Sequence, residues 1–491
     1  LTAHTFITGS TGAGKSNAIY TMLNGLCPPP RSDAQEHAES KELSDASDIH
    51  FLVIEPAKGE YKDIFGGRSD VQVYGTNSRK APLLQLNPFS FPDDTHVLEH
   101  IDRLVEVFNA CWPMFAAMPA VLKASIEAAY TECGWNLKTS TNANLQRVFP
   151  TFRNVMKALP NVVDSKGFSS DTQGDYKGAL LTRIESLTNG INGQILCAAG
   201  DEIPSKKLFG ENVIIDLSRV GSQETKALLM GMLVLKLQEY RMEERSKNGQ
   251  NDIDNNLRHI TVLEEAHNLL RRTSTEQSQD SSNLQGKSVE MLTNAIAEMR
   301  TYGEGFIIAD QAPGLLDMAV IRNTNTKIIL RLPDESDRTL VGKAAGLNDD
   351  QIVELSRLDT GVAAVYQNHW LEPVLCKVSE FTSDQRYPFD YAAVTKENTT
   401  DKVSTRMNIF FGQILHTPVI GELTSEDADN IRNWIENLQV GRNTKFDLLG
   451  VLNAKRSLSK QHMQEILYRL AGGNDFLRYA GMKTDRDAAS R

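Results

Sequence analysis

Apolar residues recur along this chain in two spacings, and their alternation predicts the fold. Short apolar runs bounded by polar turns predict strands at 5–8, 50–54, 71–74, 212–217, 259–263, 305–309, 326–332 and 361–367. Apolar residues three and four positions apart predict helices, among them 152–159, 176–187, 224–244, 289–302, 426–438 and 460–470. Strands that alternate with helices indicate an α/β fold with a doubly wound, mainly parallel sheet.

The same patterns divide the chain into four segments. Residues 1–95 and 208–381 carry the strands and form a core in two parts. Residues 96–207 have helical spacing and predict a helical insertion in that core, and residues 382–491 predict a separate helical tail. Polar stretches at 27–49, 246–256 and 271–287 predict loops or linkers.

Composition is that of a soluble globular protein, with 491 residues, 40% hydrophobic and 23% charged. No segment approaches the ~18 uninterrupted apolar residues of a membrane span. The five cysteines are scattered without a C-x-x-C pair, which argues against a zinc site and fits a reducing cytoplasm. A net charge of −11 gives the whole protein no attraction to nucleic acid, although a ring needs positive charge only on loops lining its channel.

A complete phosphate-binding loop, Gly-Ser-Thr-Gly-Ala-Gly-Lys-Ser, follows the first predicted strand and leads into a helix. Strand, glycine loop and helix together predict a nucleoside triphosphate site, because successive backbone N–H groups and the helix N-terminus attract phosphates. Lys15 would reach the β- and γ-phosphates of ATP, and the Ser16 hydroxyl would take one Mg²⁺ position. The predicted nucleotide-binding residues are Gly9, Ser10, Thr11, Gly12, Ala13, Gly14, Lys15, Ser16 and Asn17.

Hydrolysis of ATP needs carboxylates and a sensor beside the phosphates, and two strand ends supply candidates. The apolar strand 259–263 runs into Glu264 and Glu265, which matches a Walker B pattern. Glu264 would sit at the magnesium and Glu265 would be the base that activates water. Gln311 follows strand 305–309, and its amide can bond both the γ-phosphate and the attacking water.

Two further polar sites leave alternatives open. Arg300 could stabilise transition-state charge through its planar fork, or it could simply complement the dipole at a helix end. His267 in Glu-Glu-Ala-His is interpreted as structural or coupling, because ATP hydrolysis requires no histidine there. The pair Arg271–Arg272 is a weak candidate for nucleic-acid contact.

The ordered set of motifs resembles the HerA helicase/translocase family, in the HerA–FtsK branch of additional-strand P-loop ATPases. The resemblance covers roughly residues 2–381. Besides the phosphate loop, it rests on Glu-Pro-Ala-Lys-Gly-Glu-Tyr (55–61), Leu-Glu-Glu-Ala-His-Asn-Leu-Leu (263–270), Arg-Thr-Tyr-Gly-Glu-Gly (300–305), Ala-Asp-Gln-Ala-Pro (309–313) and Asn-Thr-Lys-Ile-Ile-Leu-Arg-Leu (325–332).

The resemblance implies a RecA-like core, a homo-hexameric ring with ATP sites between subunits, and double-stranded DNA in its central channel. It also implies that Arg300 acts across the interface as an arginine finger, and that Glu is acceptable at position 264. HerA proteins usually carry an N-terminal β-barrel before the phosphate loop. Because this chain starts at Leu1 and its loop already begins at Gly9, we expect that it lacks an N-terminal part.

HerA-like proteins with a large helical insertion are often bacterial and paired with a nuclease or a sirtuin-type NAD-cleaving effector in phage defence. The first hypothesis is therefore an ATP-driven DNA translocase that serves such an effector. The alternative is an ATPase ring that scaffolds and regulates the effector without processive DNA movement, which the acidic composition favours. A monomeric nucleotide kinase is a weaker hypothesis, because no acceptor-site lid is recognisable.

Overall fold

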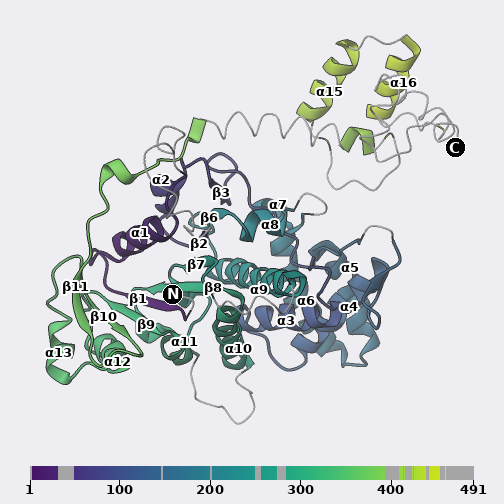
Figure 1. Ribbon diagram of the computed structural model, residues 1–491. Helices are drawn as coiled ribbons and strands as arrows, with labels where there is room; N and C mark the ends of the chain where they lie inside the picture. The colour runs from purple at the N-terminus through teal and green to yellow at the C-terminus, as the bar shows by residue number, and fades with distance from the viewer. Residues whose placement is uncertain are drawn as a thin grey trace. The chain divides into compact units, whose positions relative to one another are not determined.

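A nine-stranded sheet forms the centre of the computed structural model of this chain (Figure 1). The chain divides into two units, Leu1–Tyr391 and Ala392–Arg491, and the sheet belongs to the first. The structure describes residues 3–30, 49–144, 147–198, 202–248, 256–273, 284–392, 409–412, 414, 423, 425–437, 442–453 and 459. The predicted helix 460–470 and most of the predicted loops 27–49 and 271–287 lie outside these residues.

Most of the sheet is parallel, which confirms the predicted fold class. Its strand order is β11-β10-β9-β1-β8-β7-β2-β6-β3, and each neighbouring pair from β9 to β3 is parallel, whereas β10 pairs antiparallel with β9 and β11. The strands are β1 (Thr5–Thr8), β2 (His50–Glu55), β3 (Val71–Gly75), β6 (Asn212–Asp216), β7 (His259–Leu263), β8 (Glu304–Asp310), β9 (Thr326–Ile329), β10 (Val362–Gln367) and β11 (Val374–Lys377). No strand was predicted at β11, which is only four residues long and mostly exposed.

Helices make the connections between most of the strands. The described part of the chain between β3 and β6 forms six helices and a small hairpin of β4 (Trp135–Asn136) and β5 (Thr141–Asn142). The helices of the first unit are α1 (Lys15–Leu26), α2 (Tyr61–Phe65), α3 (Val97–Cys111), α4 (Met118–Glu132), α5 (Phe152–Ser165), α6 (Ser170–Thr188), α7 (Gly190–Leu196), α8 (Ser205–Phe209), α9 (Gln223–Asn248), α10 (Leu284–Glu298), α11 (Met318–Asn323), α12 (Glu335–Ala344) and α13 (Asp349–Glu354). Short 3-10 turns are η1 (Ala266–Asn268), η2 (Met299–Tyr302), η3 (Pro313–Leu315) and η4 (Ser383–Gln385).

Several predicted boundaries were wrong. Helix α5 continues to Ser165, beyond the predicted end at 159, and α6 begins at Ser170, before the predicted start at 176. Helix α9 continues to Asn248, into the predicted linker, and α10 begins at Leu284 rather than Val289. Apart from Leu284, the extensions of α9 and α10 consist of polar residues and one glycine, which carry no apolar period to mark them. Strand β9 ends at Ile329, three residues before the end of the predicted strand, where the chain turns away from the sheet ladder.

Both faces of the sheet are covered because side chains along each strand point alternately to opposite sides. In β2, Phe51 and Val53 join the core beneath α1 and α2, whereas Leu52 and Ile54 join the core beneath α3, α9 and α10 (Figure 1). The polar turns at the strand ends are thereby left free of either core. They are the places where functional side chains can gather.

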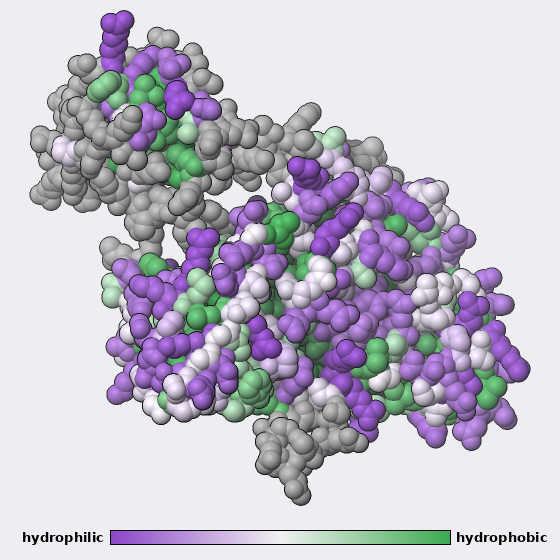
Figure 2. Space-filling view, turned by 180° about the vertical axis from the view of Figure 1, so that it is seen from behind, coloured by the Kyte–Doolittle hydropathy of each residue, from purple (hydrophilic) through white to green (hydrophobic). Residues whose placement is uncertain are grey.

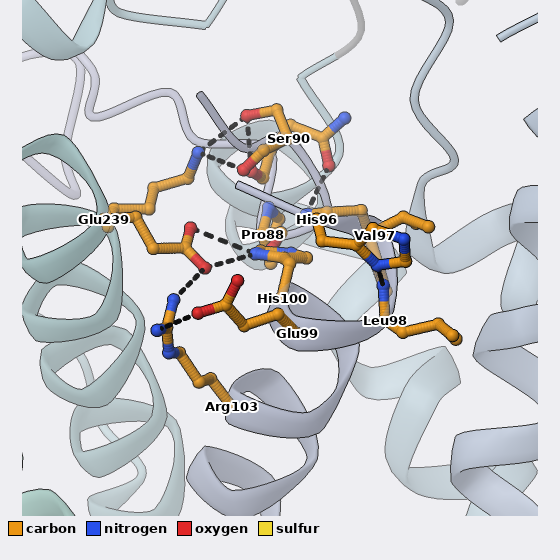
Figure 3. A network of polar contacts seen from close by, with 12 residues as sticks. Pro88, Ser90, His96, Val97, Leu98, Glu99, His100, Arg103 and Glu239 are labelled. Atoms are coloured by element: carbon orange, nitrogen blue, oxygen red, sulfur yellow. Dashed lines mark hydrogen bonds and ion pairs between the residues drawn. The ribbon is translucent and has the colours of Figure 1, made fainter. Parts of the chain in front are cut away.

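A buried polar network joins α3 to α9 (Figure 3). The two ring nitrogens of His100 contact the Glu239 carboxylate at 2.9 Å and the Pro88 carbonyl oxygen at 3.1 Å. Arg103, one turn further along α3, lies 3.7 Å from the same carboxylate. Because His100 and Glu239 are fully buried, these bonds fix how α3 packs on α9.

The first unit extends to Tyr391, beyond the predicted boundary at residue 381, because the chain after 381 packs on α2. The Tyr387 N–H donates to the Ile64 carbonyl at 2.7 Å, and its own carbonyl accepts from Gly67 at 2.8 Å. On the face of this unit seen in Figure 2, hydrophilic residues predominate and hydrophobic ones lie in small groups. None of the described helices is long and apolar enough to cross a membrane.

The described part of the second unit is helical. Its helices include α15 (Ser425–Asn437), where a helix was predicted, and α16 (Arg442–Leu452), which was not predicted. Ile431 and Ile435 of α15 pack with Leu448 of α16 in a small apolar core of their own.

A second buried network holds the amino ends of β7 and β8 together. Glu304, fully buried, accepts hydrogen bonds from Arg241 Nε at 2.8 Å and Thr261 Oγ1 at 2.7 Å, and lies 2.9 Å from His259 Nδ1. Burial alone would raise the pKa of Glu304, but His259, Arg241 and these hydrogen bonds outweigh it and hold the pKa well below its usual range.

We therefore expect Glu304→Gln to lower the free energy of unfolding at pH 7 by about 3 kcal/mol, because buried Arg241 loses its fully buried carboxylate partner and keeps only the more exposed Glu244. The contribution of Glu304 is present above the unfolded-state pKa of about 4.3, and it is lost as the pH falls toward the depressed folded-state pKa. Urea unfolding of both proteins at pH 7 and near pH 3 should show the difference shrink.

The matched control is Glu354→Gln, whose exposed carboxylate pairs at 3.3 Å with Arg357 on the surface. Its unfolding free energy should change by less than about 0.5 kcal/mol. Equal effects of the two substitutions at pH 7 would contradict the role given to Glu304.

Candidate active site

Three neighbouring strands deliver the predicted chemistry to one edge of the sheet. Strand β1 pairs with β8, and β8 pairs with β7, all in parallel, so their carboxyl ends lie side by side. The phosphate loop follows β1, Glu264 and Glu265 follow β7, and Gln311 follows β8. Ligands of open α/β sheets bind at this edge.

The phosphate loop has the backbone of an anion cradle. Gly12 and Gly14 have φ angles of 77° and 104°, in the left-handed region that favours glycine. A Cβ at Gly14 would also lie 3.1 Å from the Gly361 backbone nitrogen, so the site requires a residue without a side chain. The Gly361 N–H donates to the Ala13 carbonyl at 3.0 Å and fixes the loop from outside.

The Lys15 side chain lies in this cradle without a hydrogen-bond acceptor among the described residues. Its Nζ is buried and makes no hydrogen bond with any residue that the structure describes. The nearest carboxylate oxygen is Glu265 Oε1, at 3.5 Å. A buried ammonium that lies inside a glycine loop and lacks hydrogen-bond acceptors fits a polyphosphate, which would supply those acceptors.

The two Walker B glutamates have different surroundings. Glu264 is buried and accepts a hydrogen bond from the Tyr61 hydroxyl at 2.7 Å. Burial raises the pKa of Glu264, and Lys15 and the Tyr61 hydrogen bond oppose that rise. Glu265 has a left-handed backbone, φ 45° and ψ 52°, which costs about 1–2 kcal/mol for a non-glycine residue. This conformation turns its carboxylate toward Lys15.

Gln311 bridges the phosphate loop and Glu265. Its Nε2 donates to Glu265 Oε1, and its Oε1 accepts from the Thr11 hydroxyl at 2.7 Å. One side-chain amide thus touches both the loop that would hold phosphate and the carboxylate that would activate water. The structure brings together Lys15, Glu265 and Gln311.

Two predicted residues lie elsewhere. Both ends of the Asn17 side-chain amide face a later segment, its Nδ2 donating to the Ser379 carbonyl at 2.8 Å and its Oδ1 accepting from Phe381 N–H at 2.7 Å. Arg300 is exposed on η2, just before β8, whereas Gln311 follows β8. With seven residues in β8 and a rise of about 3.3 Å each, these positions are roughly 20 Å apart.

Sequence reasoning named Glu264 but missed three further acidic groups at neighbouring strand ends, together with their partners. Each of the adjacent strands β6, β2, β7 and β8 ends in or is followed by a buried carboxylate, namely Asp216, Glu55, Glu264 and Asp310. Glu55 accepts the N–H groups of Glu60 and Tyr61, and burial raises its pKa to about 8. Asp216 is paired with Lys62. The strand-end positions of these residues were the available signal.

The donor set fits Mg²⁺ as well as nucleotide. Ser16 and Glu264 supply oxygen, the ligand type this ion prefers. One ligand atom each of Glu265, His267 and Asp310 also lie within 4.8 Å of one another. Two hydrogen bonds from His267 to Asp310 already account for that proximity, so we do not assign a metal there.

Parts of this chain are similar in sequence to known helicases. Residues 1–237 match the family model described as the central domain of helicase HerA. A DNA double-strand break repair helicase HerA of Sulfurisphaera tokodaii is 26% identical over 383 residues, covering 78% of this chain and 66% of that protein. The HerA of Sulfolobus acidocaldarius is 28% identical over 231 residues, covering 46% and 43%. The chain thus spans at most about two thirds of these relatives.

Solved structures share the fold. VirB4 of Thermoanaerobacter pseudethanolicus superposes with a TM-score of 0.54 at 15% identity, covering 78% of this chain and 90% of that one. The plasmid coupling protein TrwB bound to a non-hydrolysable GTP analogue gives 0.51 at 12% identity, covering 79% and 89%. At such identities these two structures support the P-loop ATPase fold and nothing finer.

Removing the Tyr61 hydroxyl should weaken Mg²⁺ binding and so raise the Mg²⁺ concentration that nucleotide binding requires. In Tyr61→Phe, Glu264 loses a hydrogen bond to its charged form, so we expect the half-saturating Mg²⁺ concentration to rise about fivefold, as the loss of about 1 kcal/mol implies. Titration of Mg²⁺ against a fluorescent ATP analogue measures this. Tyr366→Phe, on β10, is the control, and an equal requirement in all three proteins would contradict the role of Tyr61.

Proposed function

Since this chain belongs to the HerA family of P-loop ATPases, we propose that it hydrolyses ATP and uses the energy to move double-stranded DNA. The HerA relatives are named as DNA double-strand break repair helicases, and this name motivates the DNA substrate. We further propose a homo-hexameric ring that serves a partner effector, a nuclease or a sirtuin-type enzyme, in defence against phage.

The observation that carries the proposal is the contact chain Thr11–Gln311–Glu265–Lys15. Glu265 is the general base, which accepts the proton of the water that attacks the γ-phosphorus. Gln311 orients that water and, through Thr11, responds to whether the loop holds a triphosphate. Mg²⁺, when bound near Ser16 and Glu264, neutralises phosphate charge.

ATP binding would rearrange the contacts of Lys15. The β- and γ-phosphates take up its Nζ, which separates it from Glu265 and frees the base to meet water. In the absence of nucleotide, Lys15 and Glu265 neutralise each other. This arrangement keeps both groups ready without leaving either charge unbalanced in a site that is nearly closed to solvent.

The position of Arg300 supports the proposed ring. At roughly 20 Å from Gln311 along β8, its side chain is too far away to serve the site of its own chain. Its exposure on η2 leaves it available to a neighbouring subunit, where its fork would stabilise phosphoryl charge. In this assignment residues 1–95 and 208–391 carry ATP chemistry, 96–207 are a helical insertion and 392–491 a separate unit.

The acidic balance of the chain favours a second candidate. With a net charge of −11, the ring could act as a regulatory scaffold for its effector, without processive movement along DNA. ATP would then set the conformation of the ring, and DNA would have no effect on turnover.

The first test is ATP hydrolysis by sized protein with and without double-stranded DNA. A hexamer whose turnover rises with DNA supports the translocase, and a hexamer indifferent to DNA supports the scaffold. Glu265→Gln should retain ATP binding and lose about 10²–10⁴-fold in turnover, the range for a general base. Lys15→Ala should lose nucleotide binding, and Glu290→Gln, exposed on α10, should behave as wild type. An active Glu265→Gln protein would refute the assignment of the base.

Mixing two inactive variants tests the role of Arg300. If Arg300 acts on a neighbour, Arg300→Ala subunits supply intact ATP sites and Lys15→Ala subunits supply intact arginines. Mixed rings should therefore regain part of the wild-type turnover, measured across a series of mixing ratios. Turnover that stays at the level of the separate variants at every ratio would restrict Arg300 to its own subunit.

A further inference from the structure

One buried carboxylate ties together the two turns that carry the base and the sensor. Asp310 ends β8, and its Oδ2 accepts two hydrogen bonds from His267, one from the backbone N–H at 2.8 Å and one from Nδ1 at 2.9 Å. Its Oδ1 accepts from Ala312 N–H at 2.9 Å, in the turn that contains Gln311. Asp310 is fully buried, so these three bonds satisfy a group that would otherwise be costly.

His267 carries this connection to the base. Its Nδ1 lies 3.6 Å from Glu265 Oε2, while Lys15 Nζ lies 3.5 Å from the other carboxylate oxygen. Glu265 is thus flanked by two nitrogen groups on opposite oxygens. When nucleotide binds, Lys15 would contact the phosphates instead of Glu265. His267 would then remain as the cationic neighbour of Glu265.

We propose that His267, oriented by Asp310, is a positioning residue that holds the Glu265 carboxylate in its orientation once Lys15 has turned to the phosphates. This inference rests on the proposed ATP hydrolysis. It gives the histidine of the Glu-Glu-Ala-His motif a role in turnover and treats Asp310 as the residue that fixes its ring. His267 itself exchanges no proton with substrate.

The charges around His267 favour its protonated form. The hydrogen bond to Asp310 raises the pKa of His267 above 6.5, burial opposes the rise, and the charges of Asp310 and Glu265 add to it. Arg271, the remaining charged group facing it, lowers the pKa. The imidazolium is therefore present at and below pH 6.5 and is lost as the pH rises through this raised pKa, so positioning fails on the alkaline side.

A purely structural clip is the competing interpretation. The two backbone hydrogen bonds of Asp310 could simply shape the turns, and His267 could be a neutral spacer. In that case substitution of His267 would change stability without changing the pH dependence of turnover. The test must therefore follow the pH profile as well as the rate.

The substitutions are His267→Gln, which offers an amide donor but cannot titrate, and Asp310→Asn, which removes the charge that orients the ring. In wild type, kcat should fall at alkaline pH. His267→Gln should lower kcat about tenfold at pH 7, leave KM within about twofold and abolish the alkaline fall. Asp310→Asn should move the fall to lower pH. His369→Gln, exposed between β10 and β11, is the control and should match wild type.

A second measurement works without turnover. Following the His267 ring by NMR in the nucleotide-free protein, we expect Asp310→Asn and Glu265→Gln each to lower its pKa. An unchanged pKa in both variants, or a wild-type pH profile in His267→Gln, overturns the inference. If wild type hydrolyses no ATP, the proposed function fails by itself, and the NMR titration still decides whether the three groups are coupled.

Discussion

The parallel pairing of β1, β8 and β7 is the constraint on which the site depends. Because these strands run in the same direction and lie next to one another, the turns that follow them meet at one edge. Their separation in sequence, nearly three hundred residues between Thr11 and Gln311, is closed by one hydrogen bond of 2.7 Å. A strand inserted between β1 and β8 would move that contact apart by about 5 Å.

Placing several carboxylates along that edge has an electrostatic cost, and the fold meets it differently at each one. Asp216 is paired with Lys62. Glu55 accepts hydrogen bonds from two backbone N–H groups, and burial raises its pKa to about 8. Asp310 has His267 beside it. The site thus gathers carboxylates where Mg²⁺ and Lys15 would bind the phosphates. Most of these carboxylates have a cationic or hydrogen-bond-donating partner in the nucleotide-free state.

The nucleotide edge is also tied to the end of the first unit. Asn17, directly after the phosphate loop, exchanges two hydrogen bonds with the segment around Ser379 and Phe381, and Phe381 packs its ring against Tyr20 and Phe65. That segment continues toward Tyr391, where the first unit ends. A residue predicted to bind nucleotide is thus occupied in holding the chain that leaves the core. The phosphate loop and the segment around Phe381 can therefore move apart only if these hydrogen bonds break.

The sequence by itself determined the local elements and the identity of the main site residues. Phosphate-loop spacing, apolar strands and acids at strand ends are patterns of neighbouring residues, so Lys15, Glu265 and Gln311 could be named from them. Only the tertiary structure decided which groups meet across the sheet, because strand order and backbone conformation arise from packing of distant segments. The hydrogen bond of Tyr61 to Glu264, the left-handed turn at Glu265 and the clasp of Asp310 on His267 are contacts of that kind, and no spacing in the chain encodes them.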